Sequence, residues 1–295
     1  MIAASTDLAL DARCSLGEGP VWWNDSLWFV DIEGRSLNRF RPRDGLHESW
    51  HVTARVGFAV PARNGDWIVA QDAALARLRP GKGEPERIVQ IEDASLGTRL
   101  NDAKCDPTGR LYLGTMHLSA TPGAGALYRL DIDSGATGRC YVATHVLDDV
   151  TISNGLAWHE PTRTMYYTDT ATGGIDAFDW CPETGEVQGR RRVADIKGGV
   201  PDGMCIDREG MLWVAIWGGS RVARVDPASG REIASVPLPC SNATSCCFGG
   251  TDSGRLWITT ARVGLSEGQL ADQPLAGGVF VADVGIGGVA AVAMR

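Results

Sequence analysis

Six short aromatic segments recur along the chain at nearly constant spacing, and this repeat constrains the fold more than any other feature of the sequence. Each segment follows a turn and is a β-rich run with an aromatic residue at its second position. The six aromatic residues are Trp28, Trp67, Tyr112, Tyr166, Trp213 and Trp257. They are separated by 39, 45, 54, 47 and 44 residues, a period of about 46. A fixed period of this length is the sequence signature of a fold built from one repeated supersecondary unit.

The residues around each aromatic segment indicate the structure of the repeated unit. Alternating apolar and polar residues end in turns of Asp, Pro, Ser and Gly, as at 36–45, 126–135 and 221–230. This pattern is typical of antiparallel strands and hairpins. No stretch shows helical periodicity over twelve or more residues, although 266–273 could hold one or two helical turns. We therefore predict an all-β fold, a six-bladed β-propeller with four-stranded antiparallel blades.

A propeller blade cannot bury both of its faces alone, so we expect one domain over residues 1–295. The strand candidate at 277–284 is expected to pair with an N-terminal strand near 8–12 and so close the ring. With 44% hydrophobic residues, the chain has ample material for such a core.

Composition and charge exclude several classes of partner. No apolar run reaches the roughly 18 residues that a membrane helix needs, and 1–13 lacks the basic start of a signal peptide. We therefore expect a cytoplasmic protein without membrane association. The net charge of -8 argues against a nucleic-acid groove, which needs a basic surface. No feature sets the oligomeric state, and we take a monomer as the default.

Two motifs suggest other chemistry, and neither has the context that it needs. The eight cysteines include no C-x-x-C pair, so we interpret most of them as reduced, small apolar residues. The segment 264–268 matches G-x-S-x-G, the nucleophile elbow of α/β-hydrolases. That fold places its catalytic histidine after the serine, whereas the last histidine of this chain is His159. We therefore expect 264–268 to be a loop.

A polar residue recurs ten to twelve positions before four of the six aromatic residues. These four are Glu18, Asn101, Asn154 and Asp202, whereas the second and sixth repeats have Val56–Gly57 and Ser245–Cys246 at the equivalent position. Two carboxylates and two amides at one mouth of the channel would offer hard oxygen ligands, which suit Ca²⁺, Mg²⁺, Mn²⁺ or a substituted Zn²⁺. Since Asx-Gly pairs also form turns, any one of these residues alone could equally be a turn former. Their recurrence in four repeats favours a site.

At these residues the sequence resembles the senescence-marker-protein (regucalcin) and gluconolactonase family of metal-dependent sugar lactonases. The matching stretches are LGEGPVW at 16–22, LWFVDI at 27–32, RLNDAKCDPTGRLYLGTM at 99–116, ISNGLAW at 152–158 and PDGMCIDREGMLWVAIWGG at 201–219, and 245–250 and 275–280 continue the match. The resemblance covers nearly the whole chain with the motifs in order. Bacterial aldonolactonases are the family members that the sequence looks most like.

The resemblance implies a role for each of the polar residues. It makes Glu18, Asn154 and Asp202 the metal ligands and Asp202 the base or proton acceptor. The same resemblance places Arg99 and Asn101 in contact with the substrate near the metal.

One departure from the family pattern concerns the loop after the G-T-M motif. Animal regucalcins have a substrate-binding glutamate shortly after this motif, whereas this chain continues with His117, Leu118, Ser119 and Ala120. The departure suggests different sugar contacts, with His117 as a candidate. The alternative for His117 is an exposed or packed loop histidine.

We therefore expect a hydrolase of carboxylic esters that opens an aldono-1,4- or 1,5-lactone in carbohydrate catabolism, with a small-molecule sugar lactone as its partner. The cofactor would be one divalent cation, Ca²⁺, Zn²⁺, Mn²⁺, Mg²⁺ or Fe²⁺. A cation can polarise the lactone carbonyl, and Asp202 could accept a proton from the attacking water. The alternatives are a calcium-binding propeller without catalysis and a hydrolase of another ester, such as an organophosphate.

Overall fold

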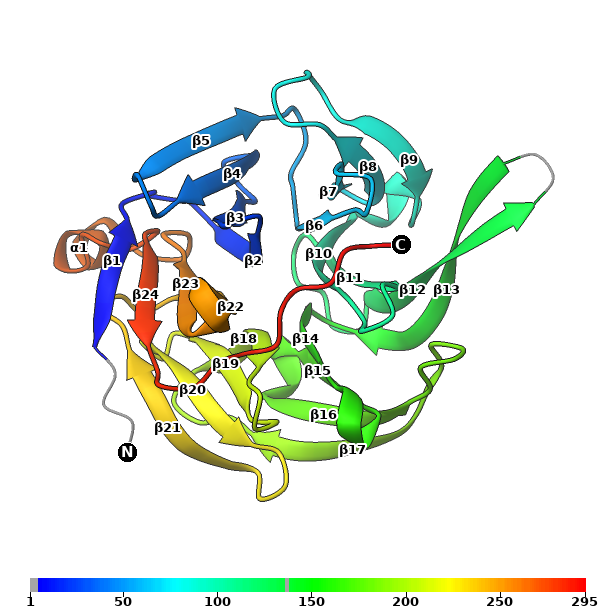
Figure 1. The fold of residues 1–295 in the computed structure, drawn as a ribbon. Helices are drawn as coiled ribbons and strands as arrows, with labels where there is room; N and C mark the ends of the chain where they lie inside the picture. Colours follow the sequence, from blue (N-terminus) through cyan, green and yellow to red (C-terminus); the bar gives the residue numbers. More distant parts are fainter. Residues whose placement is uncertain (1–4, 136–137) are drawn as a thin grey trace.

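The computed structural model describes residues 5–135 and 138–295, and its strands form six four-stranded antiparallel sheets in a ring (Figure 1). The first three sheets are β2 (Gly17–Trp23), β3 (Ser26–Asp31), β4 (Ser36–Arg41) and β5 (Leu46–His51); β6 (Ala59–Pro61), β7 (Trp67–Gln71), β8 (Ala74–Leu78) and β9 (Glu86–Gln90); and β10 (Thr98–Cys105), β11 (Leu111–His117), β12 (Gly125–Gly135) and β13 (Gly138–Val150). The next two are β14 (Ser153–His159), β15 (Thr164–Asp169), β16 (Gly174–Trp180) and β17 (Val187–Asp195), and β18 (Val200–Ile206), β19 (Leu212–Trp217), β20 (Arg221–Asp226) and β21 (Arg231–Pro237). The predicted all-β, six-bladed propeller is confirmed.

The sixth sheet joins the two ends of the chain. Its strands are β22 (Ala243–Gly249), β23 (Arg255–Thr260), β24 (Val279–Asp283) and β1 (Thr6–Leu10), in that order. Strand β1 pairs antiparallel with β24, with Thr6 opposite Ala282 and Leu10 opposite Val279. The predicted closure is confirmed, and the N-terminal strand begins two residues earlier than expected.

The repeated aromatic residues lie on the second strand of each sheet and are buried between neighbouring sheets. Trp28 of β3 packs against Trp67 of β7, with their ring centroids 4.4 Å apart and their planes tilted by 34°. Tyr112 of β11 similarly packs against Trp158 of β14 at 5.1 Å. The core therefore lies between the blades, and the period of the aromatic residues follows from this packing.

The helical segments are short. Helix α1 (Glu267–Asp272) lies between β23 and β24, and the 3-10 turns are η1 (Ala94–Leu96), η2 (Glu160–Thr162), η3 (Thr170–Thr172) and η4 (Thr251–Ser253). Ser266 caps α1, because its hydroxyl accepts a hydrogen bond from the N–H of Gln269. The serine of the G-x-S-x-G match is thus a helix cap rather than a nucleophile elbow. None of the helices in the described ranges is long and apolar enough to span a membrane.

Candidate metal and active site

The four predicted polar residues lie on the first strands of four blades and are all buried. Glu18 is on β2, Asn101 on β10, Asn154 on β14 and Asp202 on β18, and each is at most 8% exposed. Each blade begins with its innermost strand, so the starts of these strands meet at one end of the central channel (Figure 1). The structure therefore brings the predicted residues together.

A β-bulge marks the position of each of these side chains. The pairing register shifts between Glu18 and Val21 in β2, between Leu100 and Ala103 in β10, between Ser153 and Leu156 in β14, and between Pro201 and Met204 in β18. A bulge inserts a residue and re-aims the neighbouring side chains, and bulges are frequent next to active sites. The repeated bulge thus gives these residues a local geometry that a regular strand would lack.

The glycines after Asn154 and Asp202 are strand residues, so the turn interpretation is wrong for these two pairs. Neither Gly155 nor Gly203 has a positive φ. A Cβ at Gly155 would lie 2.6 Å from the carbonyl oxygen of Asp202, and one at Gly203 would overlap the side chain of Ser245. These glycines allow the inner strands of adjacent blades to approach closely.

Three buried carboxylates oppose one another at this end of the channel. Burial, followed by the negative charges of Asp202 and Asp102, raises the pKa of Glu18 well above its ordinary value. Burial and the charge of Asp102 likewise raise the pKa of Asp202, and the Asn154 amide partly offsets this. The charge of Arg99 lowers the pKa of both groups, but burial and the neighbouring carboxylates outweigh it. Asp102, which sequence reasoning did not single out, directly follows Asn101.

Two oxygens of the cluster are buried without a hydrogen-bond donor among the residues that the structure describes. They are Oδ1 of Asn154 and Oδ1 of Asp202. The Asn154 amide nitrogen donates to Oγ1 of Thr170 at 3.0 Å, which fixes the amide orientation and leaves its oxygen as a free acceptor. Unpaired buried oxygens beside carboxylates of raised pKa match the hard donors that a divalent cation takes.

The donor set is mixed, and its members fit a cation together. The described residues contain no group of three or more His, Cys, Asp or Glu side chains that could hold a metal ion. Here the donors would be the carboxylates of Glu18 and Asp202 with the amide oxygen of Asn154. Few protein donors would leave room for water or substrate, as a catalytic site requires.

Arg99 and Asn101 form a hydrogen-bonded unit beside the carboxylates. Nη1 of Arg99 donates to Oδ1 of Asn101 at 2.6 Å and to the Leu100 carbonyl at 3.1 Å. Nδ2 of Asn101 donates to the Ser153 carbonyl at 2.8 Å, which links β10 to β14. Asn101 therefore positions the Arg99 guanidinium and joins two blades at the site.

A second arginine, which the sequence analysis did not identify, lies near this unit. Nε of Arg55 donates to both carboxylate oxygens of Glu33, at 3.0 and 3.1 Å. Burial lowers the pKa of Arg99, the charges of Glu33 and Glu18 oppose that effect, and the charge of Arg55 adds to it. The guanidinium groups of Arg55 and Arg99 therefore lie close enough for their charges to interact.

His117 lies at the end of β11 and is bound within its own loop. Its Nδ1 is 3.1 Å from the N–H of Ser119 and 3.0 Å from Oγ1 of Thr121. Its Nε2 faces Gly97, where a Cβ would lie 2.9 Å away. The ring therefore holds the β11–β12 loop against the β9–β10 connection, and a contact of His117 with substrate stays a prediction.

Comparison with known proteins identifies relatives over nearly the whole chain. Residues 16–262 match the family described as SMP-30/Gluconolactonase/LRE-like region. The chain is 38% identical to regucalcin from Gallus gallus over 94% of both chains. It is 37% identical to a putative sugar lactone lactonase, YvrE, from Bacillus subtilis over 95% of both. A solved calcium-binding regucalcin from Agrobacterium tumefaciens superposes with a TM-score of 0.91 at 26% identity, covering 100% of this chain and 98% of that one. The chain therefore belongs to the SMP-30/gluconolactonase/LRE-like family.

Proposed function

We propose that this protein hydrolyses a sugar lactone with the help of one divalent cation held by Glu18, Asn154 and Asp202. The observation that carries the proposal is the pair of unpartnered buried oxygens on Asn154 and Asp202, next to carboxylates whose pKa burial has raised. The name of the Bacillus subtilis relative, a putative sugar lactone lactonase, supports the choice of substrate.

Asp202 is the residue that would move a proton in this reaction. A lactone is a cyclic ester, so hydrolysis adds water to its carbonyl carbon and breaks the bond to the ring oxygen. A divalent cation, when bound, polarises the carbonyl and stabilises negative charge on its oxygen. The ionised Asp202 carboxylate would accept a proton from the attacking water and return it to the ring oxygen as the ring opens.

Arg99 and Asn101 would orient the sugar. A guanidinium has five N–H donors, and only Nη1 of Arg99 takes part in the two hydrogen bonds to Asn101 and Leu100. The remaining donors suit hydroxyl groups or the carbonyl oxygen of a lactone. His117, which lies opposite Thr98 and so next to Arg99 in the pairing of β10 with β11, is proposed as a further sugar contact.

The substrate class sets the proposed biological context. Aldono-1,4- and 1,5-lactones form when the anomeric carbon of an aldose is oxidised, so a sugar dehydrogenase reaction would supply them. We place the protein in cytoplasmic carbohydrate catabolism, acting as a monomer.

A second candidate is a cation-binding propeller without turnover, since the Agrobacterium neighbour is described as a calcium-binding protein. Hydrolysis of another ester, such as an organophosphate, is a third. The buried Arg99 guanidinium favours an enzyme, because storage of a cation gains nothing from a second positive group beside it.

The experiment is proton release at neutral pH from a panel of aldonolactones, with spontaneous ring opening subtracted. Chelated protein is measured first, and single divalent cations are then restored. We expect turnover to disappear with the chelator and to return with one cation.

Variants assign the residues in the same assay. Asp202→Ala and Asn154→Ala should abolish turnover, whereas Asp272→Ala, on the exposed face of α1, should leave it unchanged. Full activity of Asp202→Ala would overturn the assigned role. Tight cation binding without turnover on any lactone would instead support the binding-protein candidate.

A further inference from the structure

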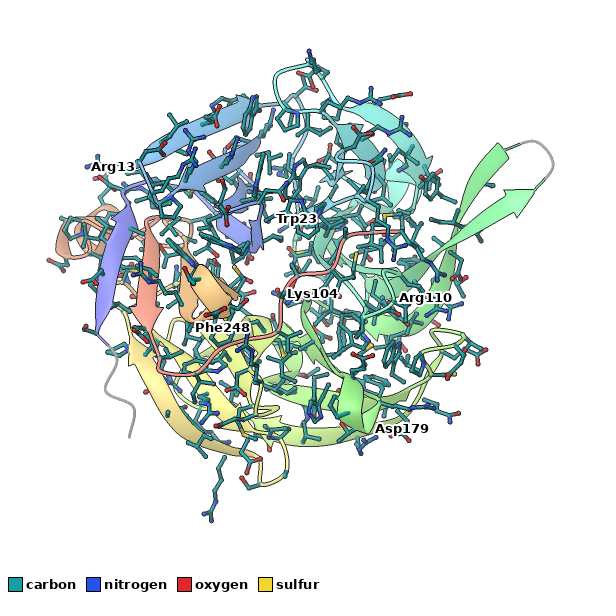
Figure 2. All side chains as sticks on the ribbon, in the orientation of Figure 1. Arg13, Trp23, Lys104, Arg110, Asp179 and Phe248 are labelled. Atoms are coloured by element: carbon teal, nitrogen blue, oxygen red, sulfur yellow. The ribbon has the colours of Figure 1, made fainter. Side chains whose placement is uncertain are left out.

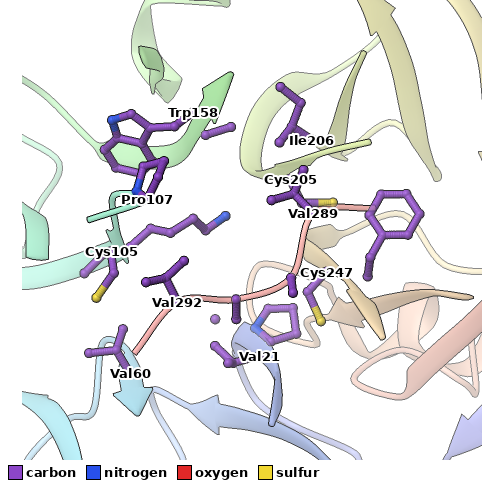
Figure 3. A pocket seen from close by; sticks show the side chains of 18 of the residues that line it. Val21, Val60, Cys105, Pro107, Trp158, Cys205, Ile206, Cys247, Val289 and Val292 are labelled. Carbon is purple, nitrogen blue, oxygen red and sulfur yellow. The ribbon is translucent and has the colours of Figure 1, made fainter. Parts of the chain in front are cut away.

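The central channel contains a cavity of about 430 Å³ (Figure 3). The proposed metal ligands Glu18, Asn154 and Asp202 are not among the residues that line it. Its lining begins at Gly19 and Asp102, next to Glu18 and Asn101, and continues along the inner strands to their other ends. The C-terminal residues 289–292 complete the lining. We call this space the channel cavity. Its volume lies within the range of small-molecule sites, roughly 300–1,000 Å³.

Most of the channel cavity is lined by apolar side chains. They include Val21, Val60, Ile206, Phe248, Val289 and Val292. Charged side chains also line it, namely those of Asp102, Lys104, Glu160, Asp207 and Arg208. Of these, the side chain of Lys104 on β10 extends into the centre of the ring (Figure 2). A charged group in such surroundings is costly unless it is paired.

The ammonium group of Lys104 has few partners. Its Nζ donates one hydrogen bond, to the carbonyl oxygen of Met204. In residues 5–135 and 138–295, no carboxylate lies within 4.0 Å of Nζ, so Lys104 has no ion pair there. Since an ammonium has three N–H donors, two remain available.

Of the other charged groups at the cavity, Asp102, Asp207 and Arg208 have partners, with Nη2 of Arg208 donating to the Asp252 carbonyl at 2.9 Å. The charge of Lys104 also lowers the pKa of Asp102. Oδ1 of Asp102 accepts a hydrogen bond from the N–H of Ala103 at 2.8 Å. Asp207 is paired with Arg224 at 2.8 Å. Lys104 therefore presents an incompletely paired positive charge to an apolar space.

The C-terminal segment covers the cavity and is attached at two points (Figure 1). The N–H of Val289 bonds to the Ile206 carbonyl at 3.1 Å, and the N–H of Met294 bonds to the Pro61 carbonyl at 2.8 Å. Between these points, the N–H groups of 290–293 form no hydrogen bond to any described residue. This stretch is therefore held by side-chain packing, with Val292 and Met294 against a hydrophobic core cluster, and not by its backbone N–H groups.

We propose that the channel cavity binds a monoanion with a compact apolar body, such as a short-chain or aromatic monocarboxylate. The carboxylate would pair with Lys104, and the body would pack against Phe248 and Val292. Lys104 is half-buried beside apolar walls. A charged group there is stabilised by a hydrogen-bonded partner of opposite charge, and this ligand supplies both the charge and the acceptors. The proposal does not depend on lactone hydrolysis, because the metal-ligand residues take no part in it.

The test is a ¹⁹F NMR titration of chelated protein with 4-fluorobenzoate and with its neutral analogue, 4-fluorobenzamide. We expect the benzoate to bind at least tenfold more tightly than the amide. Lys104→Met should weaken benzoate binding at least tenfold, whereas Lys82→Met, at an exposed loop position, should not change the benzoate affinity. Val292→Phe should weaken the binding of both probes by filling the cavity while keeping the charge.

Three results would overturn the proposal. Equal affinity for the two probes, or no binding of either, would show that Lys104 does not select an anion. Benzoate binding that persists in Lys104→Met and is lost in Asp202→Asn would place the anion among the metal-ligand residues. Because Val292→Phe leaves Lys104 unchanged, it tests the same site if Lys104→Met does not fold.

Discussion

Replacing Gly155 with alanine tests whether the close contact between β14 and β18 sets the geometry of the candidate metal site. The new Cβ would lie 2.6 Å from the carbonyl oxygen of Asp202 and 2.9 Å from the N–H nitrogen of Met204. Both atoms are backbone atoms of β18, so the two strands must separate by about 0.8 Å to reach ordinary contact at 3.4 Å. Asn154 and Asp202 lie on these strands, so their side-chain oxygens would move apart.

The expected effects follow from this displacement. Overpacking of a filled interior costs about 1–3 kcal/mol, and each kcal/mol lowers the melting temperature of a large domain by roughly 2–4 °C. A misplacement of about 1 Å in a catalytic site can cost on the order of 100-fold in rate. We therefore expect Gly155→Ala to melt several degrees lower, and to lose up to about 100-fold in kcat/KM together with part of its cation affinity.

Three measurements on one preparation check this reasoning, namely thermal unfolding, calorimetric titration with a divalent cation and initial rates on an aldonolactone. The matched control is Gly268→Ala in α1, where an added Cβ would meet no described atom within 4 Å. It should gain about 0.5–1 kcal/mol from the higher helix propensity of alanine. A Gly155→Ala protein with wild-type cation affinity and turnover would refute the idea that strand spacing sets the site.

Three further predictions concern charge. In chelated protein the raised pKa values of Glu18 and Asp202 mean that the folded state binds more protons than the unfolded state above pH about 4. Wild type should therefore gain stability relative to Asp202→Asn as the pH falls from 8 towards that value; a difference in unfolding free energy that does not vary with pH would contradict this. Asp207→Ala removes the 2.8 Å partner of the Arg224 guanidinium, which keeps Glu209 at 2.6 Å, and leaves the buried indole N–H of Trp213 without its acceptor. Urea unfolding should therefore show a loss of about 1–3 kcal/mol, and an unchanged free energy of unfolding would be contrary to expectation. Arg99→Ala should raise KM or lower kcat with its cation affinity unchanged, and loss of the cation in calorimetry would show that Arg99 has a different role.

The fold could be predicted from the sequence because its core repeats. Each blade buries one aromatic residue of its second strand between neighbouring blades, so a single packing requirement appears six times with a readable period. The closing strand was predicted for the same reason, since an unpaired β24 would leave the sixth sheet incomplete. The exact start of β1 was not readable, because neither 6–10 (TDLAL) nor 8–12 (LALDA) alternates apolar and polar residues.

The candidate site was only partly predictable. Glu18, Asn101, Asn154 and Asp202 could be found because they occupy equivalent positions in four repeats. The bulges could not be predicted from the sequence, because a bulge depends on how two strands pair and has no characteristic composition. Asp102 was missed because its neighbour Asn101 already filled the repeat position. Residues 289–292 were missed because nothing in their sequence shows that they cross the channel.

Metal-ligand residues and channel cavity share one channel, and this has a consequence for binding that rests on both proposals. Negative charge on Glu18, Asp102 and Asp202 disfavours an anion nearby, and Lys104 already acts electrostatically on Asp102. A divalent cation at the carboxylates would cancel part of that negative potential, so it should tighten 4-fluorobenzoate binding at Lys104. Linkage requires the anion to tighten cation binding by the same factor, and couplings of this kind are typically about 5- to 150-fold.

The Lys104→Met protein separates this coupling from direct contact between the anion and the cation. If the two ligands act through the shared channel, the cation should tighten benzoate binding in wild type and hardly at all in Lys104→Met, because the anion then has no charge to pair with in the cavity. If the gain is equally large in both proteins, the benzoate binds at the cation itself. Unchanged benzoate affinity in wild type on adding the cation would mean that the two ends of the channel are electrostatically isolated, and it would refute the coupling. We expect coupling because the charges of Glu18, Asp102 and Asp202 act on one another and Lys104 acts on Asp102, and Coulomb interactions are strong in a buried site of low dielectric constant.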